Sequence, residues 1–475
     1  MLFDSLEFLV FFVIVYAIYL CLRHRGQNLF LLAASYFFYG FWSWKFLLLL
    51  VATQVIDFQI SRGLDRLTDE SRRRRLMWLS VIVNMGTLAF FKYFNFFTEN
   101  LAEALRLFGG HVSDVTLNIV LPVGISFYTI QEMTYIIDVY KRRVKPAQSY
   151  VDFALFVSYF PQLVAGPIER AERLLPQVQQ PRKIHYADLM EGSWLILWGL
   201  FKKVFVADRI AMLSDQLFAQ PDTATAALGI LGSVAFTIQI YTDFSGYSDM
   251  AVGLGRLMGF RLMYNFHLPF FAVTPSDFWR RWHISLSQCL RDNLYIPMGG
   301  NRYGYGREMF ALMATMLIGG LWHGAQWHFV LWGAYCGGLL VCERLLRLLL
   351  GKDALLRPGM QAGLATRVAY ISIMFPLTVI GFIIFRAEHV SDIGHVFASL
   401  GRGIGDLDIA RHQLKEVVFC SAVLMGYQLA HYLSNDRFFV FRMPWPIRGA
   451  FYFILYLFIT VGAPHDARTF IYFQF

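Results

Sequence analysis

The 475-residue sequence predicts an all-α polytopic membrane protein. Apolar residues make up 57% of the chain and charged residues only 16%, which is too little polar side chain to cover a water-soluble protein of this length. Most of its apolar runs can be extended to about 20 residues, the length that crosses a bilayer as a helix. These runs are residues 8–22, 76–91, 331–341, 368–385 and 450–461. We expect no soluble domain of useful size.

The net charge of +9 is distributed as in a membrane protein rather than a nucleic-acid-binding one. Its basic residues form short clusters between apolar runs, as the positive-inside rule describes for cytoplasmic loops. If Arg23, His24 and Arg25 and the arginine-rich residues 62–75 are all cytoplasmic, residues 29–60 must enter and leave on one side. The N-terminus then lies outside. The five cysteines include no CxxC pair, so neither a zinc site nor a disulfide framework is expected.

Two segments are expected to enter the membrane without crossing it as one helix. Residues 29–60 are predicted to form a hairpin broken around Gly40, with arms too short to span comfortably. Residues 153–163 lead into a stretch with two prolines and a glycine, which prevents a continuous helix and predicts a re-entrant element. Such breaks are tolerated where protein or a water-filled cavity covers the exposed backbone.

A third interruption is predicted at residues 242–249, which follow an apolar run and carry two carboxylates, Asp243 and Asp249. Carboxylates at membrane depth are costly unless they are paired or functional. One interpretation is structural pairing with a neighbouring arginine such as Arg256. The other is a role in binding substrate or donor.

A charged helix is predicted from Thr274, a capping residue followed by proline, to about Asp292. It is too charged to span the membrane. It is expected either to lie at the interface or to be buried with its polar face lining an aqueous pocket. Helical spacing places Trp279, Trp282, Leu286 and Leu290 on one face and Arg280, His283, Ser287 and Arg291 on another.

Residues 319–333 hold two histidines, three tryptophans and four glycines in an apolar segment. A membrane histidine is costly unless it is paired or faces a cavity, so His323 is a candidate functional residue. The glycines around it leave room beside its ring for a substrate or for another backbone. Its neighbours Trp322, Trp327 and Trp332 are expected to supply rigid walls.

The chemistry of these residues suggests transfer of a group from a phosphorylated carrier to an alcohol. A neutral imidazole such as His323 can take a proton from a hydroxyl group. Guanidinium groups suit phosphates or a developing oxyanion, and three are candidates: Arg280, Arg281 and Arg291. The alternative is that His323 is an interhelical hydrogen-bond partner. No metal site is expected, because there is no HExxH motif and no carboxylate–histidine cluster at ligand spacing.

Sequence motifs extend in order over nearly the whole chain. They are residues 91–93, 122–128, 165–168, 243–249, 278–283, 294–297, 299–302, 321–324 with Trp327 and Trp332, and 470–473. This set resembles the signature of bacterial membrane-bound O-acyltransferases. Within that family it is most similar to the alginate O-acetyltransferase branch, which includes relatives that act on cellulose and peptidoglycan.

The resemblance implies a helical bundle with re-entrant or broken helices around a central funnel. It implies that His323 is the catalytic residue near the narrow point of the funnel and that His283 is a second functional position. The whole chain would be one membrane-embedded domain, made of N-terminal helices, a catalytic core and C-terminal helices at residues 1–145, about 150–350 and 365–475.

The implied activity uses acetyl-CoA as a cytoplasmic donor, with no bound cofactor. The acetyl group would cross the bacterial inner membrane and reach a periplasmic SGNH-type partner protein, or another acceptor, for O-acetylation of an exported polysaccharide. Direct transfer and a transient acetyl-histidine both fit the residues. The alternatives are a solute transporter or flippase, whose broken helices would line a path, and a lipid-directed acyltransferase of the same fold.

Overall fold

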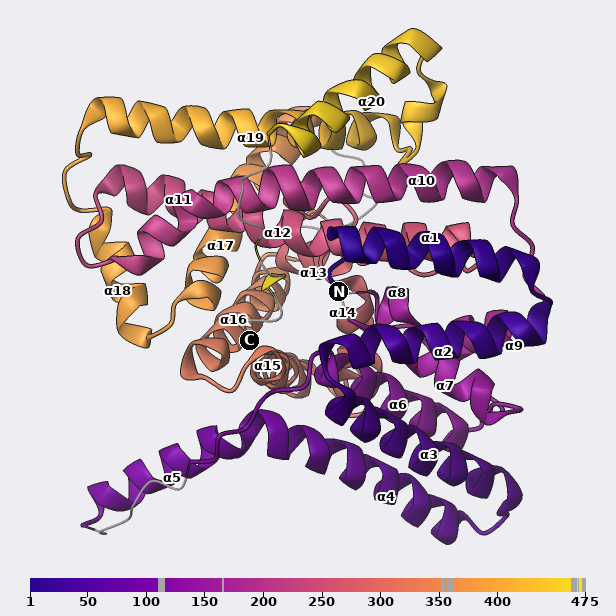
Figure 1. Cartoon of the computed structure of the whole chain (residues 1–475). Helices are drawn as coiled ribbons and strands as arrows, with labels where there is room; N and C mark the ends of the chain where they lie inside the picture. The colour runs from indigo at the N-terminus through magenta and orange to yellow at the C-terminus, as the bar shows by residue number, and fades with distance from the viewer. Residues whose placement is uncertain are drawn as a thin grey trace. The chain divides into compact units, whose positions relative to one another are not determined.

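A computed structural model describes residues 1–109, 116–164, 166–351, 355–356, 363–462, 468 and 470–471. Within these ranges all regular secondary structure is helical (Figure 1). Parts of the motifs at 165–168 and 470–473 lie outside the described residues.

Six helices in the described part of the chain are long and apolar enough to span a membrane. They are α3 (Trp44–Arg66), the continuous helix formed by α4 (Glu70–Leu88), a π-helical turn and α5 (Phe94–Leu107), α12 (Ala226–Leu257), α16 (Trp327–Leu349), α17 (Leu364–Arg386) and α19 (Leu407–Ser434). Two shorter apolar helices are α1 (Leu6–Cys21) and α20 (Trp445–Thr460). The predicted class, an all-α multi-pass membrane protein, is confirmed.

The remaining helices are shorter or more polar. They are α2 (His24–Trp42), α6 (Ile125–Tyr140), α7 (Tyr150–Ser158), α8 (Phe160–Leu163), α9 (Ala171–Gln179), α10 (Tyr186–Leu200), α11 (Asp208–Ala219), α13 (Pro275–Arg281), α14 (Ile284–Leu290), α15 (Tyr305–His323) and α18 (Val390–Ser399). Together the helices group into two compact units. The first holds residues 1–193 and 251–263, and the second holds 194–250 and 264–475.

The first unit is built on packed aromatic rings and a buried polar cluster. Rings of α1, α2 and α8 meet where Phe38 lies 6.0 Å from Phe8 and 5.8 Å from Phe160, measured between ring centroids. Between α3 and α4, Asp57 accepts hydrogen bonds from Ser80 and Asn84 at 2.5 and 2.7 Å. The turns α1–α2 and α3–α4, which carry the two basic clusters, lie at the same end of this unit, on the right in Figure 1.

The predicted helical hairpin of residues 29–60 is confirmed, with its break at Ser43, close to Gly40, while the prediction that its arms are too short to span is wrong. Gly40 lies inside α2, and the chain turns at Ser43, which has extended backbone angles. The two arms have 19 and 23 residues, so each is about 28 Å or longer and is not too short to cross a bilayer core. A single glycine costs a helix only about 1 kcal/mol, which is too little to end it.

The predicted interruption of α12 is also wrong, since α12 is one helix of 32 residues. The hydroxyl group of Thr242 donates to the carbonyl of Ile238 at 2.7 Å, so it is satisfied within the helix. The predicted loss of continuous helix is confirmed, because helix stops at Leu163 and resumes only at Ala171, and a further break at Tyr159 separates α7 from α8. These helices have nine and four residues, and neither is long enough to span a membrane.

Candidate active site

His283 lies in a break between α13 and α14, in the second unit. The predicted helix start is confirmed, because the Thr274 side chain accepts the Asp277 amide at 3.2 Å. The prediction of one helix to Asp292 is wrong, because the chain is extended at Trp282 and His283 has φ 41° and ψ 55°. A bulky residue in this left-handed region is held there by its surroundings and is a common feature of functional sites.

The surroundings that hold His283 are supplied by Asn265. The Asn265 backbone oxygen accepts the Ile284 amide at 2.9 Å, and its side-chain oxygen accepts the Ser285 hydroxyl at 2.6 Å. The Asn265 amide group donates to Ser248 of α12 at 3.1 Å. Asn265 is therefore a positioning residue that the sequence pattern did not reveal. Its only signal was a polar side chain in a largely apolar segment.

The His283 ring is buried, and burial lowers its pKa from the ordinary 6.5 to about 3. The imidazole is therefore neutral at pH 7. It lies against the Phe244 ring, with 4.7 Å between the centroids.

His323 ends α15 and lies buried among aromatic rings. The centroid of its imidazole is 4.9 Å from that of Trp322, 5.0 Å from that of Trp332 and 5.3 Å from that of Phe385. The Trp322 ring is also 6.1 Å from the ring of His283. Two histidines 40 residues apart in the sequence thus contact the same indole.

Only two of the three predicted tryptophan walls surround His323. Trp322 and Trp332 are buried against it, whereas Trp327 begins α16 and is 54% exposed. Phe385 of α17 contributes the further wall, which sequence spacing could not assign because it lies 62 residues away. His328 is buried in α16, with its ring 4.1 Å from that of the adjacent residue Phe329.

Glycines bring α15 and α16 into direct contact. A Cβ atom on Gly320 would overlap the Phe329 carbonyl, and one on Gly324 would overlap the Phe329 ring. Of the two expectations for these glycines, room for a substrate or room for another backbone, the structure shows the second at Gly320, whereas Gly324 leaves room for an aromatic ring. Because these glycines have no side chains, α15 approaches α16 closely, and this sets the position of His323 against α16.

The three candidate arginines have different surroundings. Arg281 forms an ion pair of 2.9 Å with Asp277 on its own helix, and Arg291 one of 2.7 Å with its neighbour Asp292. Arg280 instead lines a cavity of about 560 Å³. Of the three, Arg280 is therefore the one placed to meet a ligand in that cavity.

This cavity, called here the arginine cavity, lies at the ends of α15 and α16 that are remote from His323 in sequence. Inside it, Arg344 pairs with Glu308 at 2.8 Å and Arg347 pairs with Glu343 at 3.0 Å. Three arginines and two glutamates leave a surplus positive charge that suits a phosphate group. The lining residues are Ser276, Arg280, Asn301, Gly304, Tyr305, Glu308, Glu343, Arg344, Arg347 and Leu348.

Asp243 and Asp249 are paired, but not with Arg256. Asp243 lies 3.1 Å from Lys203, and Asp249 lies 2.6 Å from Lys202. The expectation of structural pairing is confirmed, while Arg256 as the partner is wrong, because that side chain pairs with Glu191 in the first unit. The two lysines lie on the π-helical turn Phe201–Ala207 after α10. Adjacent lysines in an apolar segment were the sequence signal for them.

The protein is a helical membrane protein with two buried histidines about one indole, and comparison with known families identifies its class. A model of the membrane-bound O-acyltransferase family matches residues 75–385, which include both histidines. The chain belongs to this family.

The chain is similar to several curated proteins along most of its length. It is 40% identical over 439 residues to the probable alginate O-acetylase of Azotobacter vinelandii, covering 91% of this chain and 85% of the relative. It is 43% identical over 395 residues to that of Pseudomonas aeruginosa, covering 82% and 73%. It is 36% identical over 346 residues to the peptidoglycan O-acetyltransferase of Helicobacter pylori, covering 67% and 64%. The resemblance is confirmed, and the protein is an acyltransferase rather than a transporter.

Proposed function

We propose that this protein is an O-acetyltransferase for an exported polysaccharide. It takes acetyl groups from cytoplasmic acetyl-CoA and moves them across the bacterial inner membrane, where a periplasmic SGNH-type partner protein receives them. The names of its relatives support acetylation of a polysaccharide, and alginate O-acetylases match a larger share of the chain than the peptidoglycan enzyme does. Alginate is therefore the first acceptor to examine, followed by cellulose and peptidoglycan.

The observation that carries this proposal is the placement of His323 and His283 against Trp322. In the proposed reaction His323 accepts the proton of an acceptor hydroxyl while that oxygen attacks the acetyl carbonyl. The C–O bond forms, the C–S bond of the thioester breaks, and the proton passes to the leaving thiolate. In this proposal neutral His283 hydrogen-bonds the reacting groups.

A transient acetyl-histidine is the other balanced form of this reaction. The imidazole attacks the carbonyl, the thiolate leaves, and the acceptor hydroxyl then displaces the imidazole. Both forms use the same residues.

The arginine cavity is evidence in favour of a phosphorylated acetyl donor. Its volume of about 560 Å³ lies in the range of small-molecule sites. Arg280 precedes His283 by three residues, so the segment that binds phosphate in this proposal is the one that carries the histidine. The family's expected donor, acetyl-CoA, has the phosphates that such a site recognises.

The test is transfer of radiolabelled acetyl from acetyl-CoA by the purified full-length protein in nanodiscs, with alginate oligosaccharides and the periplasmic partner. The His323→Ala protein should lose more than about 10³-fold in rate while remaining folded, because the base is lost. His328→Ala is the matched control, a buried histidine of α16, and should retain transfer. Full activity of His323→Ala would refute the assignment.

The same assay distinguishes the proposed function from that of a lipid-directed acyltransferase. Transfer with a long-chain acyl-CoA to lipid, and none with acetyl-CoA, would contradict the proposed donor and acceptor. In the native host, deletion should remove acetyl groups from one exported polymer, and chemical analysis of alginate, cellulose and peptidoglycan identifies which.

A further inference from the structure

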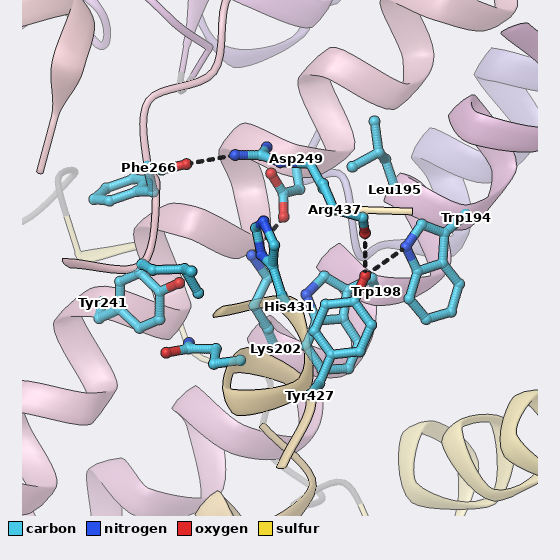
Figure 2. Close-up of a pocket in the computed structure, with 12 residues that line it drawn as sticks. Trp194, Leu195, Trp198, Lys202, Tyr241, Asp249, Phe266, Tyr427, His431 and Arg437 are labelled. Carbon is cyan, nitrogen blue, oxygen red and sulfur yellow. Dashed lines mark hydrogen bonds and ion pairs between the residues drawn. The ribbon is translucent and has the colours of Figure 1, made fainter. Parts of the chain in front are cut away.

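The second unit contains another cavity, separate from the arginine cavity in its lining residues. It has a volume of about 40 Å³ and is formed by the end of α10 with its π-helical turn, by α12, by the segment before α13 and by α19 (Figure 2). Its lining residues are Trp194, Leu195, Trp198, Lys202, Tyr241, Asp249, Phe266, Leu268, Tyr427, Gln428, His431 and Arg437. We call it the α19 cavity.

Gln428 shows that this cavity is built to hold something polar. Its side chain is only 3% exposed, and within the described ranges neither its amide nitrogen nor its amide oxygen has a hydrogen-bond partner. Leaving such a group unsatisfied costs about 1–3 kcal/mol. Because buried polar groups are normally bonded, a donor or acceptor that fills the cavity is needed to satisfy Gln428.

The charges around the cavity indicate an anion. Lys202 is neutralised by Asp249 at 2.6 Å and also donates to Ser245 at 3.0 Å. Arg437 donates to the Phe266 carbonyl at 2.8 Å, and Figure 2 shows this bond at the edge of the cavity. Among the described residues no carboxylate lies within 4.0 Å of Arg437.

Asp436, which precedes Arg437 in the chain, is already bound to other groups. Asp436 forms an ion pair of 3.1 Å with Arg442 and also accepts the Phe438 amide at 2.9 Å. The guanidinium of Arg437 lies 3.6 Å from the centre of the Tyr264 ring, which leaves its positive charge in place. The cavity therefore carries one surplus positive charge.

The size and walls of the cavity fit an oxyanion. A single buried water needs a cavity of roughly 10–15 Å³. The α19 cavity, at about 40 Å³, is larger than that. The Trp194 indole N–H donates to the Tyr427 hydroxyl oxygen at 3.3 Å, and that hydroxyl donates to the Arg437 carbonyl at 2.6 Å. These bonds, drawn in Figure 2, fix the aromatic wall beside Arg437.

We propose that the α19 cavity binds the oxyanion of a phosphate or carboxylate group. Arg437 supplies the positive charge, the amide nitrogen of Gln428 donates to the anion, and His431 lines the site beside them. The source is either a free anion or the headgroup of an anionic lipid. This site is independent of the proposed acetyl transfer and of the arginine cavity.

The test uses the purified full-length protein. Binding of radiolabelled inorganic phosphate and acetate is measured by equilibrium dialysis in detergent, at constant ionic strength set with chloride. Thermal unfolding is compared in nanodiscs of phosphatidylcholine with and without phosphatidylglycerol. Saturable binding of either ion identifies a free anion. A rise in Tm with phosphatidylglycerol, without binding of free ions, identifies a lipid headgroup.

Variants locate the binding. Gln428→Leu and Arg437→Met should each weaken it by about tenfold or more, the loss expected for a charged hydrogen bond. Arg411→Met is the matched control, an exposed arginine of α19 outside the cavity whose loss should leave binding unchanged. Absence of saturable binding and of a lipid-dependent Tm change in the unaltered protein would overturn the proposal, leaving a cavity that holds water only. Equal binding in the unaltered protein and Gln428→Leu would also overturn it.

Discussion

The side-chain oxygen of Asn265 accepts the hydroxyl of Ser285 at 2.6 Å, two residues beyond His283. With the Asn265 carbonyl bound to the Ile284 amide at 2.9 Å, this fixes the start of α14 from outside the helix. The imidazole of His283 is thus oriented by a segment 18 residues earlier in the chain.

Asn265→Ala is expected to lower kcat for acetyl transfer by about 10²-fold with little change in KM, because displacement of a catalytic side chain by about 1 Å has that effect. Asn265→Asp keeps the acceptor for Ser285 and should recover part of kcat. Steady-state kinetics on both variants measures this. A change confined to KM, or a loss of folded protein without the kcat effect, would contradict a positioning role.

Substitutions of His283 can separate the effect of backbone strain on stability from the effect of losing the imidazole on acetyl transfer. Its φ of 41° suits glycine, so His283→Gly should be more stable than His283→Ala by about 1–2 kcal/mol. Both should be deficient in acetyl transfer, because both lack the imidazole. Thermal unfolding and transfer rates, measured in the same detergent, give the two results. Equal stability of the two variants would show that the left-handed conformation is not imposed by the fold.

The contact between α15 and α16 can be tested with a pair of glycines. Gly320→Ala should destabilise the protein by about 1–3 kcal/mol and reduce transfer, because its Cβ overlaps the Phe329 carbonyl. Gly338→Ala is the control on α16, where no atom lies within 4 Å of an added Cβ, and should be neutral or slightly stabilising. Thermal unfolding compares them. Equal effects would show that the close approach is unimportant.

Lys203 is expected to be important for stability rather than for chemistry. It lies 2.7 Å from Asp208 and 3.1 Å from Asp243, and it is buried. Lys203→Met leaves these carboxylates without their cation and should cost about 3–5 kcal/mol. The double variant Lys203→Met with Asp243→Asn should recover part of that loss. The yield of monodisperse protein after heating measures both, and no recovery would argue against direct pairing.

The sequence could predict features that depend on composition and local pattern. Apolar length predicted the spanning helices that contain residues 76–91, 331–341 and 368–385, and a capping residue before proline predicted the start of α13 at Thr274. The cost of an imidazole in an apolar segment pointed to His323, which lies buried among aromatic rings. These signals are carried by neighbouring residues, so one sequence is enough to read them.

Features that depend on distant partners could not be predicted. The break at His283 arises from bonds to Asn265, and helical spacing alone favours a continuous helix there. The choice of Lys203 over Arg256 as the partner of Asp243 likewise follows from tertiary packing. Phe385 reaches His323 from α17, and no periodicity connects residues on separate helices.

Trp322 contacts both His283 and His323, and this has a consequence for mutational epistasis. A substitution at Trp322 removes one support from each imidazole at once, so its effect and that of a change at His283 should not add. His283, Trp322 and His323 are therefore expected to change together in evolution. A lineage that altered the indole would have to re-establish the setting of both histidines before it regained the original enzyme.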